Sequence, residues 1–392
     1  MDRADRTVCM SARDSLRAGV CERLVEGRLS EQEAASRLAL SVRQVRRLKR
    51  RVRDEGPKGV IHRSRGRASP KRLSDGVRGT VENLYRQTYT GWNMVHLSEY
   101  LSARHGIELS SETLRQVLLD DEARPRRRRR KQHRQWRERR PREGELVQMD
   151  TSIHPWLGDD GERAVLISAV DDATSRILWA AFYEHNGVLE NLAVVRDIIV
   201  TLGLPQSLYL DHHTIFFVPE ADALAARERG EEARTQFGKV MKHLGIEMIP
   251  AGSPQAKGRI ERSYRTLQDR LLKELRLEGI RTRAAANGYL HETFIPAYNE
   301  RFGVEPADSD GAWIPAGPID EHAVFCLRDT RVVQNDATIS VAGQKWQLHG
   351  SVRSGQKVEL RTWLDGSVHT YKGDAELAYH RIQEATATAA AQ

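Results

Sequence analysis

The stretch Glu145-Leu-Val-Gln-Met-Asp150 is a short apolar run that ends in an aspartate. A second run of this kind is Ser207-Leu-Tyr-Leu-Asp211, and Ser253-Pro-Gln-Ala-Lys-Gly-Arg-Ile-Glu261 leads a glutamate into a predicted helix. Short apolar runs between polar residues favour buried strands. Three carboxylates gathered at strand ends and on a facing helix would suit hard divalent cations, which prefer oxygen ligands.

The region around these residues, 145–302, alternates predicted strands and helices. Further apolar runs at 164–170 and 177–183 predict strands, and a helix over 188–202 precedes the strand at 208–210. A helix near 234–244, a strand at 246–249 and the glutamate helix follow. The order β-β-β-α-β-α-β-α is that of the ribonuclease H-like fold, a mixed sheet with helices packed on it. Its first and fourth strands are neighbours, so Asp150 and Asp211 are expected to meet.

Glu261 lies in a helix whose start is predicted by Ser253 as a cap and Pro254 at the first helical position. The glutamate is about 100° from Ile260, at the margin of an apolar stripe, and is expected to lean toward the strand ends. Basic residues that suit phosphates surround it: Lys257, Arg259, Arg262 and Arg265.

Other residues compete for roles at this site. An aspartate at a strand end often only forms a turn, and Asp171 and Asp172 lie in a predicted hairpin turn where acids cap backbone amides. His212 and His213 adjoin Asp211, and His154 follows Asp150. Each histidine is interpreted either as orienting a substrate or as a packing or surface residue.

Residues 1–55 are predicted to form a helix-turn-helix DNA-binding domain of three short helices. Leu16, Val20, Leu24 and Val25 are expected on the inner face of the first helix, and Ser30-Glu-Gln-Glu33 is a capping box. Ser41 caps the third helix. The outer face of this helix is basic where a recognition helix contacts bases and phosphates, at Arg43, Gln44, Arg46, Arg47 and Lys49. A plain amphipathic bundle is the alternative.

A second helical domain is predicted between two basic linkers. In the first linker, 56–73, Arg65 and Arg67 stand beside small residues and suit a minor groove. Residues 74–122 predict a second helix-turn-helix domain, with Arg115 on a helix capped by Ser110.

The second linker, 123–144, is rich in arginine. Residues 124–140 hold eleven Lys or Arg against one acid, which would release counterions from a polyanion. The expected phosphate contacts are Arg127, Arg128, Arg129, Arg130 and Lys131. A solvated linker without contacts is the alternative interpretation.

The C-terminal residues 322–382 contain short alternating stretches separated by turn residues, which predict a small β-barrel. Residues 383–392, rich in alanine and threonine, are expected to be a disordered tail.

The composition agrees with a nucleic-acid-binding protein, since the net charge of the 392 residues is +8. Three scattered cysteines exclude a disulfide framework. No apolar run is long enough for a membrane span, and the N-terminus lacks the apolar run of a signal peptide. A cytoplasmic location is therefore expected.

Five segments resemble a known family: 147–150, 170–176, 208–211, 253–262 and 268–276. They look like the integrase catalytic core of bacterial DDE transposases, closest to insertion-sequence enzymes with helix-turn-helix N-termini and a retroviral-integrase-like core. The resemblance implies two Mg²⁺ or Mn²⁺ ions per active site, held by Asp150, Asp211 and Glu261. It also implies nicking at element ends and strand transfer by the freed 3′-hydroxyl.

The partners that the resemblance implies are DNA, both terminal inverted repeats and target DNA, and further copies of the chain. A homo-oligomer, dimer or higher, would bridge two ends on DNA, with catalysis often in trans. Such an enzyme is expected in the bacterial cytoplasm, associated with the nucleoid.

The chain departs from the family pattern at two points. The interval from Asp211 to Glu261, 261 − 211 = 50, is longer than in many members, and residues 219–234 are interpreted as an inserted or extended helix. Gln268 stands where a basic residue is common, so Arg265 or Lys257 is expected to contact phosphates instead. A non-joining nuclease of the same fold and a domesticated DNA-binding regulator remain alternatives to a transposase.

Overall fold

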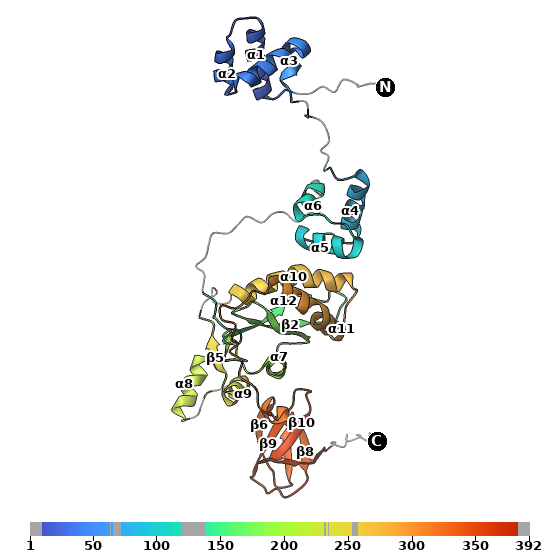
Figure 1. The fold of residues 1–392 in the computed structure, drawn as a ribbon. Coiled ribbons are helices and arrows are strands. Elements are labelled where there is room, and N and C mark those ends of the chain that lie inside the picture. The colour runs from blue at the N-terminus through green and yellow to red at the C-terminus, as the bar shows by residue number, and fades with distance from the viewer. Residues whose placement is uncertain are drawn as a thin grey trace, which may run out of the picture. The chain divides into compact units, whose positions relative to one another are not determined.

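The computed structural model describes residues 10–62, 64, 65, 72–118, 138–230, 233, 235–252 and 258–382. The chain divides into two compact units, Met1–Asn83 and Leu84–Gln392 (Figure 1). Several residues singled out in the sequence lie outside the described part: Arg67, Arg127 to Lys131, Ser253 to Lys257 and the tail 383–392.

The first unit contains the predicted three-helix domain. It consists of α1 (Ala12–Val25), α2 (Glu31–Leu38), α3 (Val42–Glu55) and the 3₁₀ helix η1 (Gly56–Val60). Each α-helix begins with a capping box. The serine side chain accepts a hydrogen bond from the amide three residues later, and the side chain of that later residue accepts one from the serine amide. The caps predicted at Ser30 and Ser41 are confirmed. The core of this unit includes Cys21, Leu24, Ala34, Val45 and Val52.

The expected inner face of α1 is wrong at one position. Leu16 is 61% exposed, whereas Leu24 is 1% exposed. The helix instead turns Ala18 and Cys21 inward, together with the carboxylate of Asp14. Apolar character alone placed Leu16 inside, but small residues fill the space between closely packed helices.

The second unit begins with the rest of a helical region. The division between the units falls inside α4 (Asp75–Gln87), which is followed by α5 (Met94–His105) and α6 (Ser111–Val117). Asn93 and Ser110 cap α5 and α6. Aromatic and leucine side chains form the core of this region, including Tyr89, Trp92, Leu97, Leu101 and Leu114.

A five-stranded mixed sheet follows, with strand order β3-β2-β1-β4-β5. Strands β1 (Val147–Ile153), β2 (Val165–Asp171) and β3 (Ile177–Tyr183) are antiparallel neighbours, whereas β4 (Ser207–Leu210) and β5 (Glu247–Pro250) continue the sheet in parallel with β1. The expected neighbourhood of the first and fourth strands is confirmed. This is the strand order expected of a ribonuclease H-like sheet.

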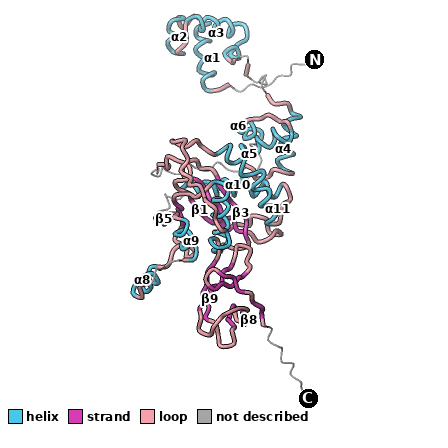
Figure 2. The backbone as a smooth tube through the Cα atoms, turned by 60° about the horizontal axis from the view of Figure 1, so that its bottom comes forward, coloured by secondary structure: helices cyan, strands magenta, loops and turns pink. Residues whose placement is uncertain are grey.

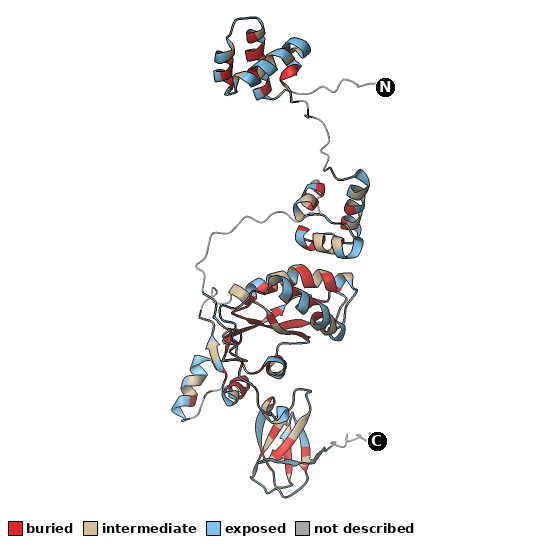
Figure 3. Ribbon diagram, viewed as in Figure 1, coloured by how far each residue is buried: buried red, intermediate tan, exposed pale blue. Residues whose placement is uncertain are grey.

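Helices cover both faces of the sheet, so β2 is buried along its whole length (Figure 3). Ile167 and Ala169 share one core with α7 (Val188–Leu202) and α9 (Gln236–Leu244). Leu166 and Val170 point to the other face, where they share a core with α10 (Gly258–Leu277) and the helices after it. Figure 2 shows the strands and the flanking helices in separate colours.

The remaining helices surround this frame. The stretch expected to be an inserted helix contains α8 (Glu220–Glu228). After α10 come α11 (Arg283–Tyr289), a π-helical turn η2 (Leu290–Phe294), α12 (Ile295–Phe302) and the short α13 (Glu321–Val324). α11, η2 and α12 contribute Ala286, Phe294 and Tyr298 to the core under α10.

The C-terminal strands do not close into the barrel expected from the sequence. They form two antiparallel sheets, one of order β11-β10-β9-β6 and one of order β12-β8-β7. The strands are β6 (Leu327–Val332), β7 (Thr338–Val341), β8 (Gln344–Leu348), β9 (Lys357–Thr362), β10 (Val368–Lys372), β11 (Ala375–Leu377) and β12 (Tyr379–Arg381).

The two small sheets share one core, to which Ile339, Trp346, Val358 and Leu360 belong. The chain passes between the sheets after β6, after β8 and, at Ala378, between β11 and β12. These two strands have three residues each, which is short for the continuous pairing that a closed barrel requires.

Candidate active site

Asp150 and Asp211 stand on neighbouring parallel strands at the same level. β1 pairs with β4 in the register Val147 with Leu208 and Gln148 with Tyr209. Extended beyond the last observed pair, this register (147 + 3 = 150 and 208 + 3 = 211) puts Asp150 level with Asp211, the first residue beyond β4. Adjacent strands lie about 4.8 Å apart, and level residues of parallel strands share a face. Strand pairing therefore brings together two of the three predicted carboxylate residues.

The first turns of α10 are attached to β1 beside this pair. The amide of Ile260 donates to Oε1 of Gln148 at 3.3 Å, and the hydroxyl of Tyr264 donates to the carbonyl of Asp150. Burial raises the pKa of Tyr264 well above its ordinary value, so this hydroxyl stays protonated and remains a donor. Glu261 lies between these two anchors and is exposed. The backbone of α10 is thus attached to β1 at Gln148 and Asp150, next to the third carboxylate residue. The sequence placed Asp150 at a strand end, but β1 continues past it to Ile153 because that strand pairs with β2 along its full length.

Asp171 and Asp172 have structural roles, as their turn position suggested. Asp171 accepts from the amide of Gly144 at 3.0 Å and from the amide and hydroxyl of Thr174 at 2.7 and 2.8 Å. Asp172 accepts from Gln148 Nε2 at 2.6 Å and from Arg259 Nη1 at 2.7 Å. Both aspartates are fully buried. Burial raises the pKa of Asp171, and the bonds from Gly144 and Thr174 oppose that shift.

The histidines beside the aspartates make local contacts. The Nδ1 atom of His213 accepts from the amide of Ile215 at 3.2 Å, and the amide of His213 donates to Oδ1 of Asp211 at 3.3 Å. The ring of His212 lies 5.9 Å from that of Phe217, and His154 lies edge-on to Trp156 at 5.5 Å. These contacts match the packing interpretation of the histidines.

The described residues include no group of three or more His, Cys, Asp or Glu side chains arranged to hold a metal ion. The donor chemistry of the site is nevertheless suitable, because Asp150, Asp211 and Glu261 offer only carboxylate oxygens.

Within the described ranges, no helix is long and apolar enough to cross a membrane.

Similarity to known proteins decides the family. The chain is 36% identical over 365 residues to the putative transposase y4bF of Sinorhizobium fredii (strain NBRC 101917 / NGR234), a match that covers 92% of this chain and 79% of that protein. The chain belongs to the transposase family. The present chain is also 29% identical over 323 residues to the transposase for insertion sequence IS1202 of Streptococcus pneumoniae, a match that covers 72% of this chain and 67% of that protein.

The helical part of the transposase matches a family model described as a homeodomain-like domain over residues 14–118. This range includes α1 to α6 and therefore both predicted helix-turn-helix regions. It supports DNA binding by the N-terminal part of the chain.

Solved integrase structures are also similar to the transposase. The catalytic core domain of BIV integrase is 19% identical, with 38% of this chain and 85% of that chain covered and a TM-score of 0.25. A chain of the simian T-cell lymphotropic virus intasome in complex with PP2A regulatory subunit B56 gamma is 13% identical, with 78% and 100% covered and a TM-score of 0.34. The HTLV-2 integrase catalytic core domain in complex with magnesium is 15% identical, with 39% and 88% covered and a TM-score of 0.27. These TM-scores are too low to assign the fold, which is assigned instead from the strand order of the chain itself.

Of the described residues expected to contact DNA, some are exposed in the structure of the transposase and others have protein partners. On α3, Arg43, Arg46 and Arg47 are exposed and Lys49 is half-buried, but Arg46 pairs with Glu31 at 2.6 Å. Gln44 is held in the cap, where its Oε1 accepts from the amide of Ser41 at 3.0 Å. Gln44, which was expected to contact bases, thus takes part in the cap of α3.

Three further arginines expected to bind DNA have protein partners. Arg65 pairs with Asp14 in the first unit, and Arg115 pairs with Glu112 at 2.8 Å on α6. The side chain of Arg259 is 9% exposed and pairs with Asp172. In this structure Arg259 therefore ties α10 to the turn after β2, and its expected contact with DNA stays a prediction. Arg262 and Arg265 of the same helix are exposed, and so is Gln268.

Proposed function

We propose that this transposase binds the ends of a mobile element, cleaves a phosphodiester bond there and joins the 3′-hydroxyl end to target DNA. The observation that carries the proposal is the register of β1 and β4, which makes Asp150 and Asp211 neighbours beside the first turns of α10. Family membership makes DNA the substrate. The chemistry is therefore assigned to the three carboxylates.

The proposed cofactor is Mg²⁺ or Mn²⁺, two ions per active site, held by Asp150, Asp211 and Glu261. Such ions would activate a water or a 3′-hydroxyl and neutralise charge on the leaving oxygen. The attachment of α10 to Gln148 and Asp150 next to Glu261 supports this assignment.

The reaction proceeds in two displacements at phosphorus. In the first, the oxygen of water bonds to phosphorus and the P–O3′ bond breaks, leaving a 3′-hydroxyl at the element end. In the second, that 3′-oxygen bonds to a target phosphorus, a P–O3′ bond of the target breaks, and the proton of the attacking hydroxyl is lost. No oxidant and no high-energy cofactor are required.

The partners in this proposal are terminal-repeat DNA, target DNA and other copies of the chain. Exposed Arg43 and Arg47 on α3 and the α6 region would bind the repeat, while Arg262 and Arg265 on the outer side of α10 would contact phosphates near the cut. A homo-oligomer, dimer or higher, would hold two ends together.

The proposal is tested with a labelled oligonucleotide of an element end that presents a 3′-hydroxyl, target plasmid and Mg²⁺. We expect joined product from the wild-type protein and none from Glu261→Gln, which keeps the shape of the side chain but not its charge. Electrophoretic mobility shifts should show equal binding of the end DNA by both. Glu305→Gln, which removes an exposed carboxylate paired with Arg176, is the matched control and should join normally.

Each alternative predicts a different result in this assay. Cleavage without joined product would favour a nuclease, and DNA binding without metal-dependent chemistry would favour a regulator. Full activity in Glu261→Gln would overturn the site assignment.

A further inference from the structure

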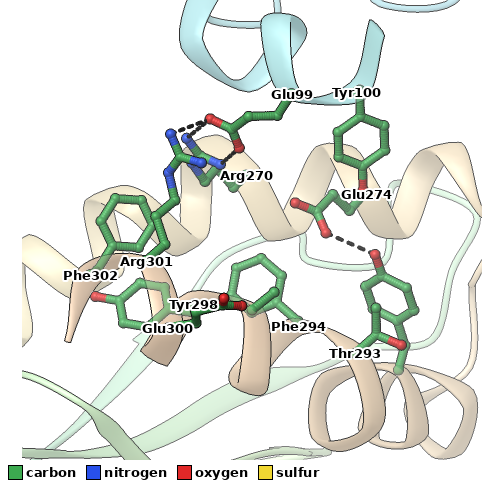
Figure 4. Close-up of a pocket in the computed structure, with 12 residues that line it drawn as sticks. Glu99, Tyr100, Arg270, Glu274, Thr293, Phe294, Tyr298, Glu300, Arg301 and Phe302 are labelled. Atoms are coloured by element: carbon green, nitrogen blue, oxygen red, sulfur yellow. Dashed lines mark hydrogen bonds and ion pairs between the residues drawn. The ribbon is translucent and has the colours of Figure 1, made fainter. Parts of the chain in front are cut away.

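A row of polar side chains on α5 meets a row on α10, both within the unit Leu84–Gln392. Figure 4 shows part of this contact, with Glu99 of α5 and with Arg270 and Glu274 of α10. Asn93 at the cap and His96, Glu99 and Arg104 along α5 follow helical spacing and lie on one side of the helix. Their partners are Asp269, Arg270 and Glu274 on α10 and Glu278, the first residue after it. The apolar stripe of α10, including Tyr264 and Leu271, faces the sheet. One helix therefore connects the sheet to the helical region.

The strongest part of this contact is centred on Glu99. Its carboxylate accepts two bonds from Arg270, at 2.7 and 3.2 Å, and pairs with Arg301 of α12 at 2.5 Å. The side chain of Arg270 is only 10% exposed. A buried guanidinium requires such a partner, because charged groups are rarely buried unpaired. Figure 4 shows both arginines converging on this glutamate.

A second buried contact lies one turn away, at His96. Its Nε2 bonds to Oε1 of Glu274 at 2.9 Å, and the hydroxyl of Tyr289 donates to the other oxygen of Glu274 at 2.8 Å. His96 is fully buried and stacks on Trp92 with ring centroids 4.1 Å apart. Burial lowers the pKa of His96, so the neutral ring donates its Nε2–H to the carboxylate.

Two further contacts extend the row on either side. Asn93 donates to Asp269 at 2.5 Å, and Arg104 pairs with Glu278. The buried Nδ1 of His96 has no hydrogen-bond partner, but the charged groups of Glu99, Arg270 and Glu274 are all paired. A shifted arrangement would leave these buried charges unpaired. The contact therefore fixes α5 at one position along α10.

α10 also carries Glu261 in its first turn, 274 − 261 = 13 residues before Glu274. At 1.5 Å per residue, about 20 Å of helix separates the proposed catalytic glutamate from the contact with α5. α5 in turn packs on α6, where the hydroxyl of Ser98 donates to the carbonyl of Leu109. The expected DNA-contacting helix α6 is thus tied to Glu261 through rigid elements.

We infer that the α5–α10 contact is a positioning contact, which sets the distance along DNA between the sequence bound by α6 and the bond that is cut. This inference rests on the proposed function. Glu99 and Arg270 are its central positioning residues. They act by orienting the bound DNA and do not touch the reacting atoms.

The test compares the position of the cut, mapped at single-nucleotide resolution on end-labelled terminal-repeat DNA with Mg²⁺. Glu99→Arg places a third cation against Arg270 and Arg301 and should separate α5 from α10. We expect cleavage at the wild-type position to fall by about tenfold or more, since displacement by about 1 Å can cost a hundredfold. The remaining cuts should spread to neighbouring bonds, while the affinity for repeat DNA stays close to that of the wild type.

The matched control is Glu108→Arg, the same charge change at an exposed residue just beyond α5, whose carboxylate accepts a hydrogen bond from the Ser102 hydroxyl. It should cut at the wild-type position. Unchanged cutting by Glu99→Arg would overturn the inference and leave the proposed function intact. A wild-type protein that does not cut at all would instead overturn the proposed function.

A variant with α5 covalently tethered next to α10 shows whether their contact positions the DNA for cutting or inhibits the enzyme. Cysteines in place of Arg104 and Glu278 are joined by a short bismaleimide in a chain that also carries Cys9→Ser, and intramolecular joining is verified by mass spectrometry. Cys21 and Cys326 are buried and should not compete. The tethered protein should cut at the wild-type position. If it binds repeat DNA but does not cut, the contact inhibits the enzyme and the inference is wrong.

Discussion

Arg259 of α10 donates from Nη1 to Oδ1 of Asp172 at 2.7 Å, and this ion pair is buried between the helix and the sheet. Gln148 of β1 donates to the same oxygen and also accepts from the amide of Ile260. β1, α10 and the turn after β2 therefore share one buried polar cluster. β1 and α10 carry two of the three carboxylates proposed to be catalytic, Asp150 and Glu261.

Arg259→Ala should destabilise the second unit by about 3–5 kcal/mol, because it leaves a buried carboxylate without its cation. Urea unfolding followed by circular dichroism measures the effect. Arg265→Ala removes an exposed arginine of the same helix and should change stability by less than about 0.5 kcal/mol. Equal losses in the two variants would contradict the structural role of Arg259.

Two leucines of α1 should respond very differently to truncation. Leu24 is 1% exposed and Leu16 is 61% exposed, so Leu24→Ala should cost about 2–5 kcal/mol. Leu16→Ala should stay within about 0.5 kcal/mol. Thermal unfolding of the full chain, followed at the transition of the first unit, measures both. A large loss from Leu16→Ala would mean that this residue is covered.

Arg47→Ala should weaken binding to terminal-repeat DNA and lower the slope of log K against log salt by about 1, if this exposed arginine of α3 contacts a phosphate. Fluorescence anisotropy at several salt concentrations measures the slope. Arg13→Ala, an exposed arginine at the start of α1, is the control. An unchanged slope for Arg47→Ala would remove this residue from the interface.

Acid should weaken the first unit through Asp14. A hydrogen bond from the Ser11 side chain, with a further bond from Arg65, lowers the pKa of Asp14 from 3.8 to about 2. A lowered folded-state pKa gives stability that is present above about pH 4 and is lost as the pH falls toward 2. The unfolding midpoint in urea should therefore decrease over this range.

Asp14→Asn removes the titrating group and should flatten that part of the pH profile. The variant should also be less stable than the wild type at neutral pH. A profile that keeps the wild-type slope would show that another carboxylate is responsible.

Strong local signals explain which features were predictable. The capping boxes at Ser30 and Ser41 need only residues within four positions, and strand runs such as 164–170 are short, apolar and bounded by turns. Such local signals did not predict contacts between residues that are far apart in the sequence. The sequence could not show that Asp172 would pair with Arg259, 87 positions away, nor that the C-terminal strands would form two sheets.

The α5–α10 contact was also missed, although part of its signal was present. Arg270, Glu274 and Glu278 follow the spacing of one helix face, but an exposed charged face gives the same pattern. Only the structure shows that His96 is fully buried against Glu274.

By itself, the sequence determined the order of strands and helices, because apolar periodicity and caps act within a few residues. It also indicated Asp211 just after a strand and Glu261 early in a helix, but it ended the first strand at Asp150, whereas β1 continues to Ile153. The tertiary structure decided the register that makes Asp150 and Asp211 neighbours, the burial of Arg259 and the attachment of α5 to α10. These depend on contacts between distant residues, whose free energies are set by burial and by the partners available in the folded chain.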